Sequence, residues 1–182
     1  NTEVWDEVGW ESFAEVFRRA RAADPQARLC YNDYNISQED AGYRNKVRAR
    51  IKYLLERNVP LDVLGDQGHM SLPLTPLHRV LEIWDEWAAF GKDLEITEFD
   101  LGCPDDTVHA EYTRDYLIAA FSHPAMKSFI FWGFWEGSHW RAKDGGAMVR
   151  RDWSKRPALE AYEDLVFRQW WTRWEGRSAA DG

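Results

Sequence analysis

The chain has few cysteines, no long hydrophobic run and no excess of basic residues. Its 182 residues include two cysteines, Cys30 and Cys103, which are too few for a disulfide framework, so we expect two buried thiols. No apolar stretch approaches the roughly 20 residues of a membrane helix, and we expect no membrane span. The net charge of -8 lacks the basic face that phosphate binding needs, so nucleic acid is not an expected partner.

Signals for cofactors and for export are also missing. No glycine-rich turn follows the first predicted strand, which excludes the dinucleotide-binding fingerprint. The five histidines show no His-Glu-x-x-His spacing, and no cysteine pair accompanies them, so we expect neither a metal nor a cofactor. The chain shows no signal peptide and begins with Asn1, and we expect a processed product or a fragment.

Hydrophobic patterns predict alternating helices and strands. Four short apolar runs indicate buried strands about 33 residues apart, the length of a βα unit; they cover residues 27–31, 61–64, 94–97 and 128–131. Five stripes with helical spacing lie around them; they include Phe13 to Ala20, Val47 to Leu55, Leu77 to Ala88, Tyr112 to Ala120 and Tyr162 to Trp170. Thr75 before Pro76 is expected to cap the third helix, and Pro157 to open the last. This alternation predicts a parallel sheet covered by helices, in one domain over residues 1–182.

Polar and aromatic residues follow each predicted strand. Functional groups at the carboxyl ends of all strands are typical of a (β/α)8 barrel, which has eight strands and about 250 residues. Only four strands are predicted here, and a helix comes before the first. We therefore predict an α/β fold of the TIM-barrel type, with this chain forming its second half, strands five to eight.

The segment 93–100 carries two carboxylates at the end of a strand. Side chains alternate along a strand, so Glu98 and Asp100 should lie on the same side. A carboxylate at the end of a buried strand is costly unless it is paired or used. Pairing of Glu98 with a lysine or arginine is the structural alternative to a catalytic role.

Four motifs together resemble glycoside hydrolase family 10, the retaining endo-β-1,4-xylanases. They occur in the family's order and with βα spacing, and the resemblance covers essentially the whole chain. The motifs are Leu29-Cys30-Tyr31-Asn32-Asp33-Tyr34-Asn35, Gly65-Asp66-Gln67-Gly68-His69, Ile96-Thr97-Glu98-Phe99-Asp100 and Trp132-Gly133-Phe134-Trp135-Glu136-Gly137-Ser138-His139-Trp140.

The resemblance implies a catalytic group of three residues. Retaining glycosidases use one carboxylate as nucleophile and one carboxyl group as general acid and base. Glu98 matches the family's nucleophile, His69 matches the histidine that orients it, and Asp100 supports His69. A hydrogen-bonded partner of this kind keeps a carboxylate oriented.

The resemblance also implies the substrate-binding residues. Gln67 matches a glutamine that contacts the sugar beside the cleaved bond, and Trp132 and Trp140 match two tryptophans that wall the sugar on the non-reducing side. Tyr34 and Asn35 match positions on the aglycone side. The substrate implied is xylan or a xylo-oligosaccharide, and the location implied is secreted or periplasmic.

Some positions stay open at this stage. Glu136 matches a common acidic position, but we assign it no catalytic role. Asn32 is expected to be partly structural, and Tyr34 to be the more exposed group. Trp135 and Trp153 remain unassigned. The other tryptophans of the predicted helices are expected to pack in the outer shell: Trp84, Trp87, Trp170, Trp171 and Trp174.

The general acid and base of the family has no match in this chain. It ends strand four in an Asn-Glu pair, which we expect a few residues before Asn1; Glu3 has the wrong spacing to replace it. Two hypotheses follow: half of a xylanase that needs the rest of its barrel, or a carbohydrate-binding or structural half-barrel that is inactive alone. Exposed edges near Cys30 and Phe129 predict pairing with the missing half or self-association.

Overall fold

The computed structural model describes residues 3–179 and contains a parallel sheet. β4 lies in the middle of the sheet and pairs in parallel with β2, β3 and β5, while β1 pairs in parallel with β2. The strands are β1 (Cys30–Asp33), β2 (Val63–Asp66), β3 (His69–Ser71), β4 (Asp93–Gly102) and β5 (Met126–Phe131). β2 and β3 follow one another along the same side of β4, so together they form one interrupted strand.

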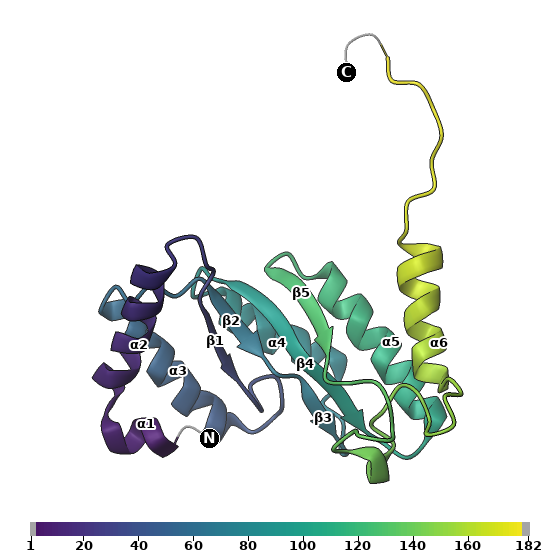
Figure 1. The fold of residues 1–182 in the computed structure, drawn as a ribbon, viewed down its shortest axis with the longest axis horizontal. Coiled ribbons are helices and arrows are strands. Elements are labelled where there is room, and N and C mark those ends of the chain that lie inside the picture. The colour runs from purple at the N-terminus through teal and green to yellow at the C-terminus, as the bar shows by residue number, and fades with distance from the viewer. Residues whose placement is uncertain (1–2, 180–182) are drawn as a thin grey trace.

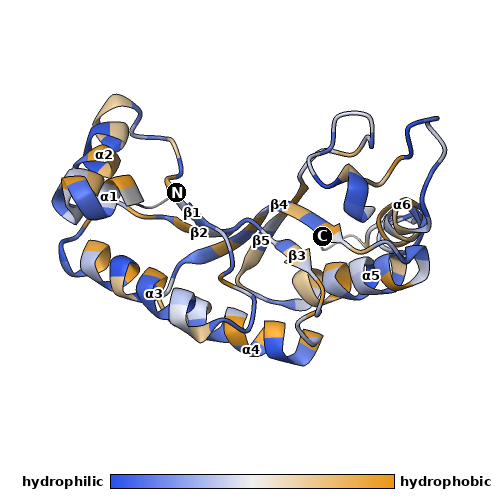
Figure 2. Cartoon of the chain, turned by 90° about the horizontal axis from the view of Figure 1, so that it is seen from below, coloured by the Kyte–Doolittle hydropathy of each residue, from blue (hydrophilic) through white to orange (hydrophobic). Residues whose placement is uncertain are grey.

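Helices follow the strands and cover one face of the sheet. In Figure 2 the sheet curves, and α3, α4 and α5 form an arc beneath its convex face. The helices are α1 (Glu3–Val8), α2 (Trp10–Ala23), α3 (Ala41–Glu56), α4 (Leu77–Ala88), α5 (Asp106–Ser122) and α6 (Pro157–Glu163), which continues into the π-helix η2 (Asp164–Gln169); a 3-10 turn, η1 (Ala142–Asp144), lies in the loop after β5. α1 and α2 stand at one end of the arc and α6 at the other (Figure 1). This is the layering of an open segment of a barrel.

The predicted alternation of helices and strands is confirmed, but α1 and β3 were not predicted and several boundaries differ. β1 and β2 begin two or three residues later than predicted, and the polar strand ends belong to the sheet because the ladder extends through Asp33 and Asp66. α4 begins at Leu77 with Pro76 as its N-cap and no side-chain cap. The predicted cap by Thr75 is therefore wrong; Thr75 is buried, and its carbonyl accepts a hydrogen bond from Tyr112.

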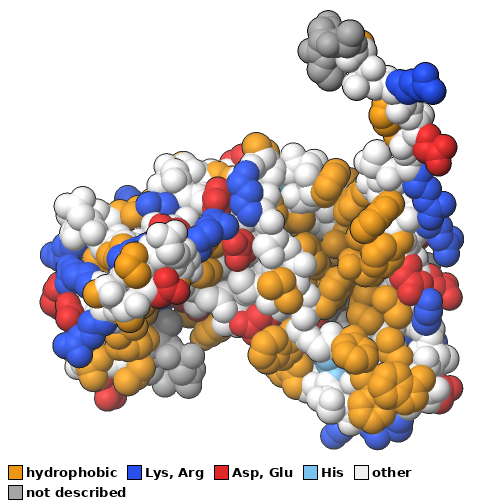
Figure 3. Space-filling view, turned by 45° about the horizontal axis from the view of Figure 1, so that its top comes forward, with side chains coloured by type: hydrophobic (Ala, Val, Ile, Leu, Met, Phe, Trp, Pro, Cys, Tyr) orange, Lys and Arg blue, Asp and Glu red, His pale blue; other side chains and the backbone are white. Residues whose placement is uncertain are grey.

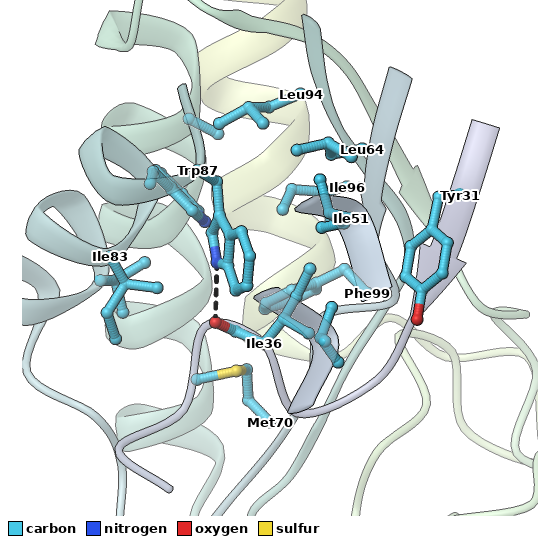
Figure 4. Close-up of a cluster of buried hydrophobic side chains, with 14 of the residues drawn as sticks. Tyr31, Ile36, Ile51, Leu64, Met70, Ile83, Trp87, Leu94, Ile96 and Phe99 are labelled. Atoms are coloured by element: carbon cyan, nitrogen blue, oxygen red, sulfur yellow. Dashed lines mark hydrogen bonds between the residues drawn. The ribbon is translucent and has the colours of Figure 1, made fainter. Parts of the chain in front are cut away.

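The hydrophobic core lies between the convex face of the sheet and the helices. Figure 4 shows Leu64, Leu94 and Ile96 from the strands near Ile51 of α3 and Trp87 of α4. Trp87 is 1% exposed and donates its indole N–H to the carbonyl of Ile36 at 3.0 Å. Burying aromatic and aliphatic side chains on this face fixes the register of each strand, because a slip by one residue would turn that face to solvent.

The tryptophans divide into two groups. Trp84 and Trp87 pack as predicted, but in the core between the sheet and the helices rather than in an outer shell. Trp171 and Trp174 are 61% and 74% exposed and lie beyond the last helix, so the prediction that they pack in the shell is wrong. Trp170 is half-buried and stacks on Phe121, with 4.2 Å between the ring centroids.

The sheet ends in β1 on one side and β5 on the other, the two edges predicted near Cys30 and Phe129. Within residues 3–179, neither strand has a second neighbour. Both cysteines are free; Cys103 is buried, whereas Cys30 is only half-buried at the β1 edge, and burial raises the pKa of its thiol to about 11. No helix in this part of the chain has both the length and the apolar character needed to cross a bilayer.

Candidate active site

A pocket of about 340 Å³ opens at the carboxyl ends of the strands. Seven of the eight residues predicted for the site line this pocket, and the eighth, Asp100, is buried behind His69. The lining residues are Tyr34, Asn35, Gln67, His69, Glu98, Trp132, Trp140 and Arg141. They come from the loops after β1, β2 and β5, from the first residue of β3 and from the second half of β4, which parallel pairing places at the same edge of the sheet.

Both carboxylate oxygens of Glu98 are held by neighbouring side chains. Asn32 donates from Nδ2 to Oε1 at 2.9 Å, and His69 Nε2 lies 3.4 Å from Oε2. No lysine or arginine among the described residues forms an ion pair with Glu98, so the structural alternative for this residue is not supported. The carboxylate is oriented by a neutral amide and an imidazole and remains accessible from the pocket.

His69 joins Glu98 to Asp100. Its Nδ1 donates to Asp100 Oδ1 at 3.0 Å, because a carboxylate can only accept. Glu98 is a carboxylate too, so Nε2 holds its Oε2 by donating as well, with a hydrogen on both ring nitrogens. The predicted arrangement of Glu98 and Asp100 on the same side of β4 is confirmed, since one imidazole contacts both.

Asp100 is 2% exposed and is surrounded by donors. The indole N–H of Trp140 donates to its Oδ2 at 2.5 Å, and Arg141 Nε lies 3.4 Å from its Oδ1. A buried carboxylate is tolerated when it is paired and hydrogen-bonded. Asp100 therefore fixes the positions of three pocket residues: His69, Trp140 and Arg141.

A glycine makes the contact between Asn32 and Glu98 possible. Asn32 lies on β1 and Thr97 on β4, with β2 between them. Thr97 Oγ1 donates to Asn32 Oδ1 at 2.7 Å across Gly65 of β2. A Cβ at Gly65 would lie 2.8 Å from both Asn32 Oδ1 and Cys30 Sγ, so only glycine leaves room for this bridge.

Trp132 and Trp140 form the aromatic side of the pocket. They are 48% and 59% exposed, and their rings meet His69 edge-on, with centroid distances of 6.2 and 5.2 Å. The buried ring of His139 supports them: its Nδ1 accepts from the Arg141 N–H at 3.1 Å, and its Nε2 donates to the Trp132 carbonyl at 2.9 Å. Both nitrogens of His139 are therefore engaged by the backbone.

Tyr34, Asn35 and Gln67 lie on the other side of Glu98. Tyr34 packs on Tyr43 with 4.8 Å between centroids, and Asn35 has a positive φ of 55°. The backbone of Gln67 links the strands, since its N–H donates to the carbonyl of Asp33 and its carbonyl accepts from the Glu98 N–H.

The expected exposures in the β1 motif are reversed. Asn32 is exposed and reaches Glu98, whereas Tyr34 is half-buried. The sequence pattern could not separate them, because both are polar residues at a strand end, and only the pairing of β1 with β2 fixes the direction of Asn32.

Arg141 is the pocket residue that the sequence analysis missed. Its Nη1 donates to the carbonyl of Met70 at 2.7 Å, and its guanidinium lies 4.5 Å from the centroid of the Trp140 ring. Gly102 of β4 has no side chain, and a Cβ there would lie 2.8 Å from Arg141 Nη1. The only feature of the sequence that could have indicated Arg141 as a pocket residue is its position directly after Trp140.

Glu136 and Glu3 are the two further acidic residues that the sequence analysis considered. Glu136 pairs with Arg156 at 3.1 Å, which agrees with the absence of a catalytic assignment. Glu3 begins α1, and its side chain lies outside the described residues. Across the described part of the chain, no three His, Cys, Asp or Glu side chains are arranged to hold a metal ion.

Comparison with known proteins identifies the relatives of this chain. Residues 1–165 match the model of glycosyl hydrolase family 10. The anti-sigma-I factor RsgI6 of Acetivibrio thermocellus is 30% identical over 177 residues, which are 96% of this chain and 22% of that protein. Endo-1,4-beta-xylanase B of Thermotoga neapolitana is 33% identical over 140 residues, 73% of this chain and 40% of that enzyme.

The solved structures agree on the fold. Xylanase 10B from Thermotoga petrophila, crystallised with xylobiose, superposes with a TM-score of 0.75 at 24% identity. The superposition covers 87% of this chain and 52% of that one, so the chain spans about half of the relative's length. The family predicted from the four motifs is confirmed: this chain belongs to glycosyl hydrolase family 10 and forms part of its (β/α)8 barrel.

Proposed function

We propose that this chain is the second half of a catalytic barrel that hydrolyses internal β-1,4-xylosidic bonds in xylan. Glu98 acts as the nucleophile of a retaining double displacement and attacks the anomeric carbon to form a glycosyl-enzyme, which water then hydrolyses. The supporting observation is that Asn32 and His69 hold the two Glu98 oxygens beside an open, tryptophan-walled pocket.

His69 and Asp100 position the nucleophile in this proposal. Asp100 fixes the imidazole through Nδ1, and Nε2 then contacts Glu98. Trp132 and Trp140 wall the sugar whose bond is cleaved, Gln67 contacts its hydroxyl, and Tyr34 and Asn35 contact the leaving part of the chain. Fixed partners lower the cost of reorganisation in the transition state.

The general acid and base has to come from the remaining strands of the barrel. General acid catalysis typically contributes about 10²–10⁴-fold, so residues 1–182 alone should cleave xylan poorly. The complete barrel, meaning this chain joined to those remaining strands, is the species in which activity is expected. Since xylan is a large polysaccharide, we expect the protein to act in a secreted or periplasmic location.

A mechanism-based inhibitor tests the role of Glu98. The complete barrel is incubated with a 2-deoxy-2-fluoro-xylobioside that has an activated leaving group, and the labelled peptide is identified by mass spectrometry. We expect the label on Glu98, because the fluorine slows hydrolysis of the glycosyl-enzyme. Asp100→Asn is the matched control, since it changes a neighbouring carboxylate that is not expected to carry the sugar.

Two results would contradict the proposal. A label on another carboxylate would assign the nucleophile elsewhere. Inversion of the anomeric configuration, followed by NMR of fresh product, would exclude a glycosyl-enzyme on any residue.

A non-catalytic half-barrel that binds carbohydrate is the second candidate. It is favoured by the relative RsgI6, which is named as an anti-sigma factor rather than a hydrolase and matches 96% of this chain. Xylohexaose binding without hydrolysis by the complete barrel, measured by calorimetry and by product analysis, would support this candidate over the enzyme.

A further inference from the structure

In its second half, β4 carries one residue more than the strands on either side of it. On one side, Asp66 of β2 pairs with Ile96. His69 of β3, three residues further along the chain, pairs with Asp100, which is four residues further along β4. The pairing with β5 also shifts after Ile96, where three steps along β4 face two along β5. An extra residue that neither neighbour matches is a β-bulge, and it lies within residues 97–99.

The burial pattern of β4 shows the same extra residue. Leu94 and Ile96 pack in the core, but the next core residues are Phe99 and Leu101 rather than the next residues of even number. Figure 4 shows Leu94, Ile96 and Phe99 within one cluster of buried side chains. Side chains alternate along a regular strand, so Glu98 would share the core face of Ile96 if the strand were regular. The bulge therefore turns Glu98 to the pocket.

The link between β2 and β3 faces this bulge and binds its backbone. The Glu98 N–H donates to the Gln67 carbonyl at 3.0 Å, and the Asp100 N–H donates to the Gly68 carbonyl at 3.4 Å. Gln67 and Gly68 are the two residues of the link, so each holds the main chain of one active-site carboxylate. The Gln67 N–H donates in turn to the carbonyl of Asp33 at 2.9 Å. The conformation of the link therefore decides where Glu98 lies.

The Gly68 N–H depends on the side chain of Asp66, because no backbone carbonyl among the described residues accepts from it. The carboxyl of Asp66 turns over the link, and its Oδ1 accepts from the Gly68 N–H at 2.9 Å. Gly68 has a φ of 72°, and a Cβ there would lie 3.0 Å from Ile96 Cγ2. Glycine allows the left-handed turn, and a buried N–H without an acceptor would be costly. Asp66 and Gly68 together fix the turn.

Asp66 is not held in place by an opposite charge. It is 5% exposed, and no lysine or arginine in the described part of the chain forms an ion pair with it. Burial raises the pKa of its carboxyl, although the nearby Ser37 and the Gly68 N–H lower it. Its second oxygen, Oδ2, has no hydrogen-bond partner within residues 3–179. A buried aspartate that is costly in this way indicates that the bond from Gly68 to Oδ1 has a function.

We propose that Asp66 is a positioning residue for the nucleophile. Its carboxyl holds the Gly68 N–H, the Gly68 turn holds the link opposite the bulge, and the bulge directs Glu98 into the pocket. This inference rests on the proposed role of Glu98 as nucleophile. Asp66 does not line the pocket, and Gln67 keeps its own bond to Asp33, so Asp66 acts on kcat and leaves binding of the sugar nearly unchanged.

Asp66→Leu tests the inference, because it removes the acceptor and leaves a side chain of similar size. In the complete barrel we expect kcat on xylohexaose to fall about 10–50-fold and KM to change less than about 3-fold, since a misplacement by about 1 Å can cost about 10²-fold in rate. The rate at which the 2-deoxy-2-fluoro-xylobioside labels Glu98 should fall by a similar factor. Its activated leaving group needs little acid assistance, so this rate reports the attack by Glu98.

Three further variants complete the comparison. Asp66→Asn keeps an oxygen acceptor for the Gly68 N–H and should retain most of kcat. Gly68→Ala disturbs the same turn by another route, since its Cβ would meet Ile96 Cγ2, and should lower kcat with KM nearly unchanged. Asp24→Leu removes a matching bond, from the Gln26 N–H to Asp24 Oδ1 at 2.9 Å, in the turn before β1, and should leave kcat unchanged.

The outcomes separate this inference from the proposed function. A label on a carboxylate other than Glu98 in the parent would reject the proposed nucleophile, and this inference with it. A label on Glu98 with equal labelling rates in the parent and in Asp66→Leu would overturn the role of Asp66 alone. Equal losses of kcat in Asp66→Leu and Asp66→Asn would also overturn it, because asparagine keeps the acceptor. If Asp66→Leu does not fold, Gly68→Ala decides, and an unchanged labelling rate in that variant overturns the inference.

Discussion

The candidate active site and a second hollow beside it share Trp132 and Trp140 but are built in different ways. We call this second hollow, of about 430 Å³, the aromatic groove; its lining residues are Trp132, Gly133, Phe134, Trp135, Ser138, His139, Trp140 and Trp153. Figure 3 shows hydrophobic side chains gathered on the side of the molecule where α6 and the residues after it lie.

The active site stands on the ends of several strands, and its polar side chains hold one another through hydrogen bonds. The groove stands on one loop, between β5 and α6, and consists of aromatic faces. Strand ends hold polar side chains to within about 0.5 Å, which is the precision that catalysis needs. A loop can present an apolar surface that only has to match the shape of a ligand's ring.

The largest effect should come from the nucleophile. Glu98→Ala in the complete barrel should lower kcat on xylan more than about 10³-fold, because no glycosyl-enzyme can form. Binding of xylo-oligosaccharides to the active site should persist, as measured by calorimetry. A variant as active as the parent would show that Glu98 has no catalytic role.

The hydrogen bond from Asn32 should be the next largest contribution. Asn32→Ala leaves Glu98 Oε1 without its donor, and a hydrogen bond to a charged group is typically worth about 1.5–3 kcal/mol, so kcat should fall about 10–100-fold. Asn32→Asp should be at least as damaging, since it places a second negative charge beside Glu98. An unchanged kcat in both variants, with unchanged melting temperature, would make Asn32 structural.

Gly65→Ala tests the hydrogen bond between Asn32 and Glu98 through the strand that lies between them, β2. The new Cβ would lie 2.8 Å from Asn32 Oδ1 and displace it, so kcat should fall about 10-fold while the affinity for xylohexaose changes little. Gly91→Ala, at a turn remote from the site, is a control for the loss of a glycine. A fall in kcat that persists in the Asn32→Ala background would show that Gly65 acts by another route.

Trp140 connects the two hollows, and its substitution should affect both modestly. Trp140→Phe keeps an aromatic face but removes the N–H that bonds Asp100 at 2.5 Å. We expect a loss of about 3–10-fold in kcat and a smaller loss of ligand affinity, because loss of this bond loosens Asp100 and then His69. Trp132→Phe, whose ring has no bond to Asp100, should change affinity more than kcat. Equal kcat losses in the two variants would contradict the role of the Trp140–Asp100 bond.

Asp66→Asn, which changes a buried residue at the end of β2, should have the smallest effect on hydrolysis and should act on stability instead. Burial raises the pKa of the Asp66 carboxyl from 3.8 to about 6. A raised folded pKa means that its stabilising contribution is complete below pH 4 and is lost as the pH rises through 6; linkage limits it to about 3 kcal/mol. Asp66→Asn should therefore gain stability relative to the parent between pH 4 and 7.5, measured by urea unfolding. An unchanged difference across this range would show that Asp66 does not titrate there.

Sequence patterns predicted most of the fold and the membership of the site. Periodic apolar residues mark α2, α3, α4 and α5, since each must bury one face against the sheet. Their alternation with short apolar runs requires parallel strands, and parallel strands bring their carboxyl ends together. The four motifs at those ends therefore had to meet in one pocket, and Glu98, His69 and Asp100 do so.

The tertiary structure decided which side chains touch. Arg141 and Asn32 enter the site through contacts across strands or loops, between residues far apart in the sequence, and no local pattern encodes these contacts. The same holds for Trp135 and Trp153, which the sequence left unassigned and which the turn at 150–155 brings into a stack. Local periodicity fixes which face of an element is buried, whereas the direction of an exposed side chain depends on the neighbours that folding supplies.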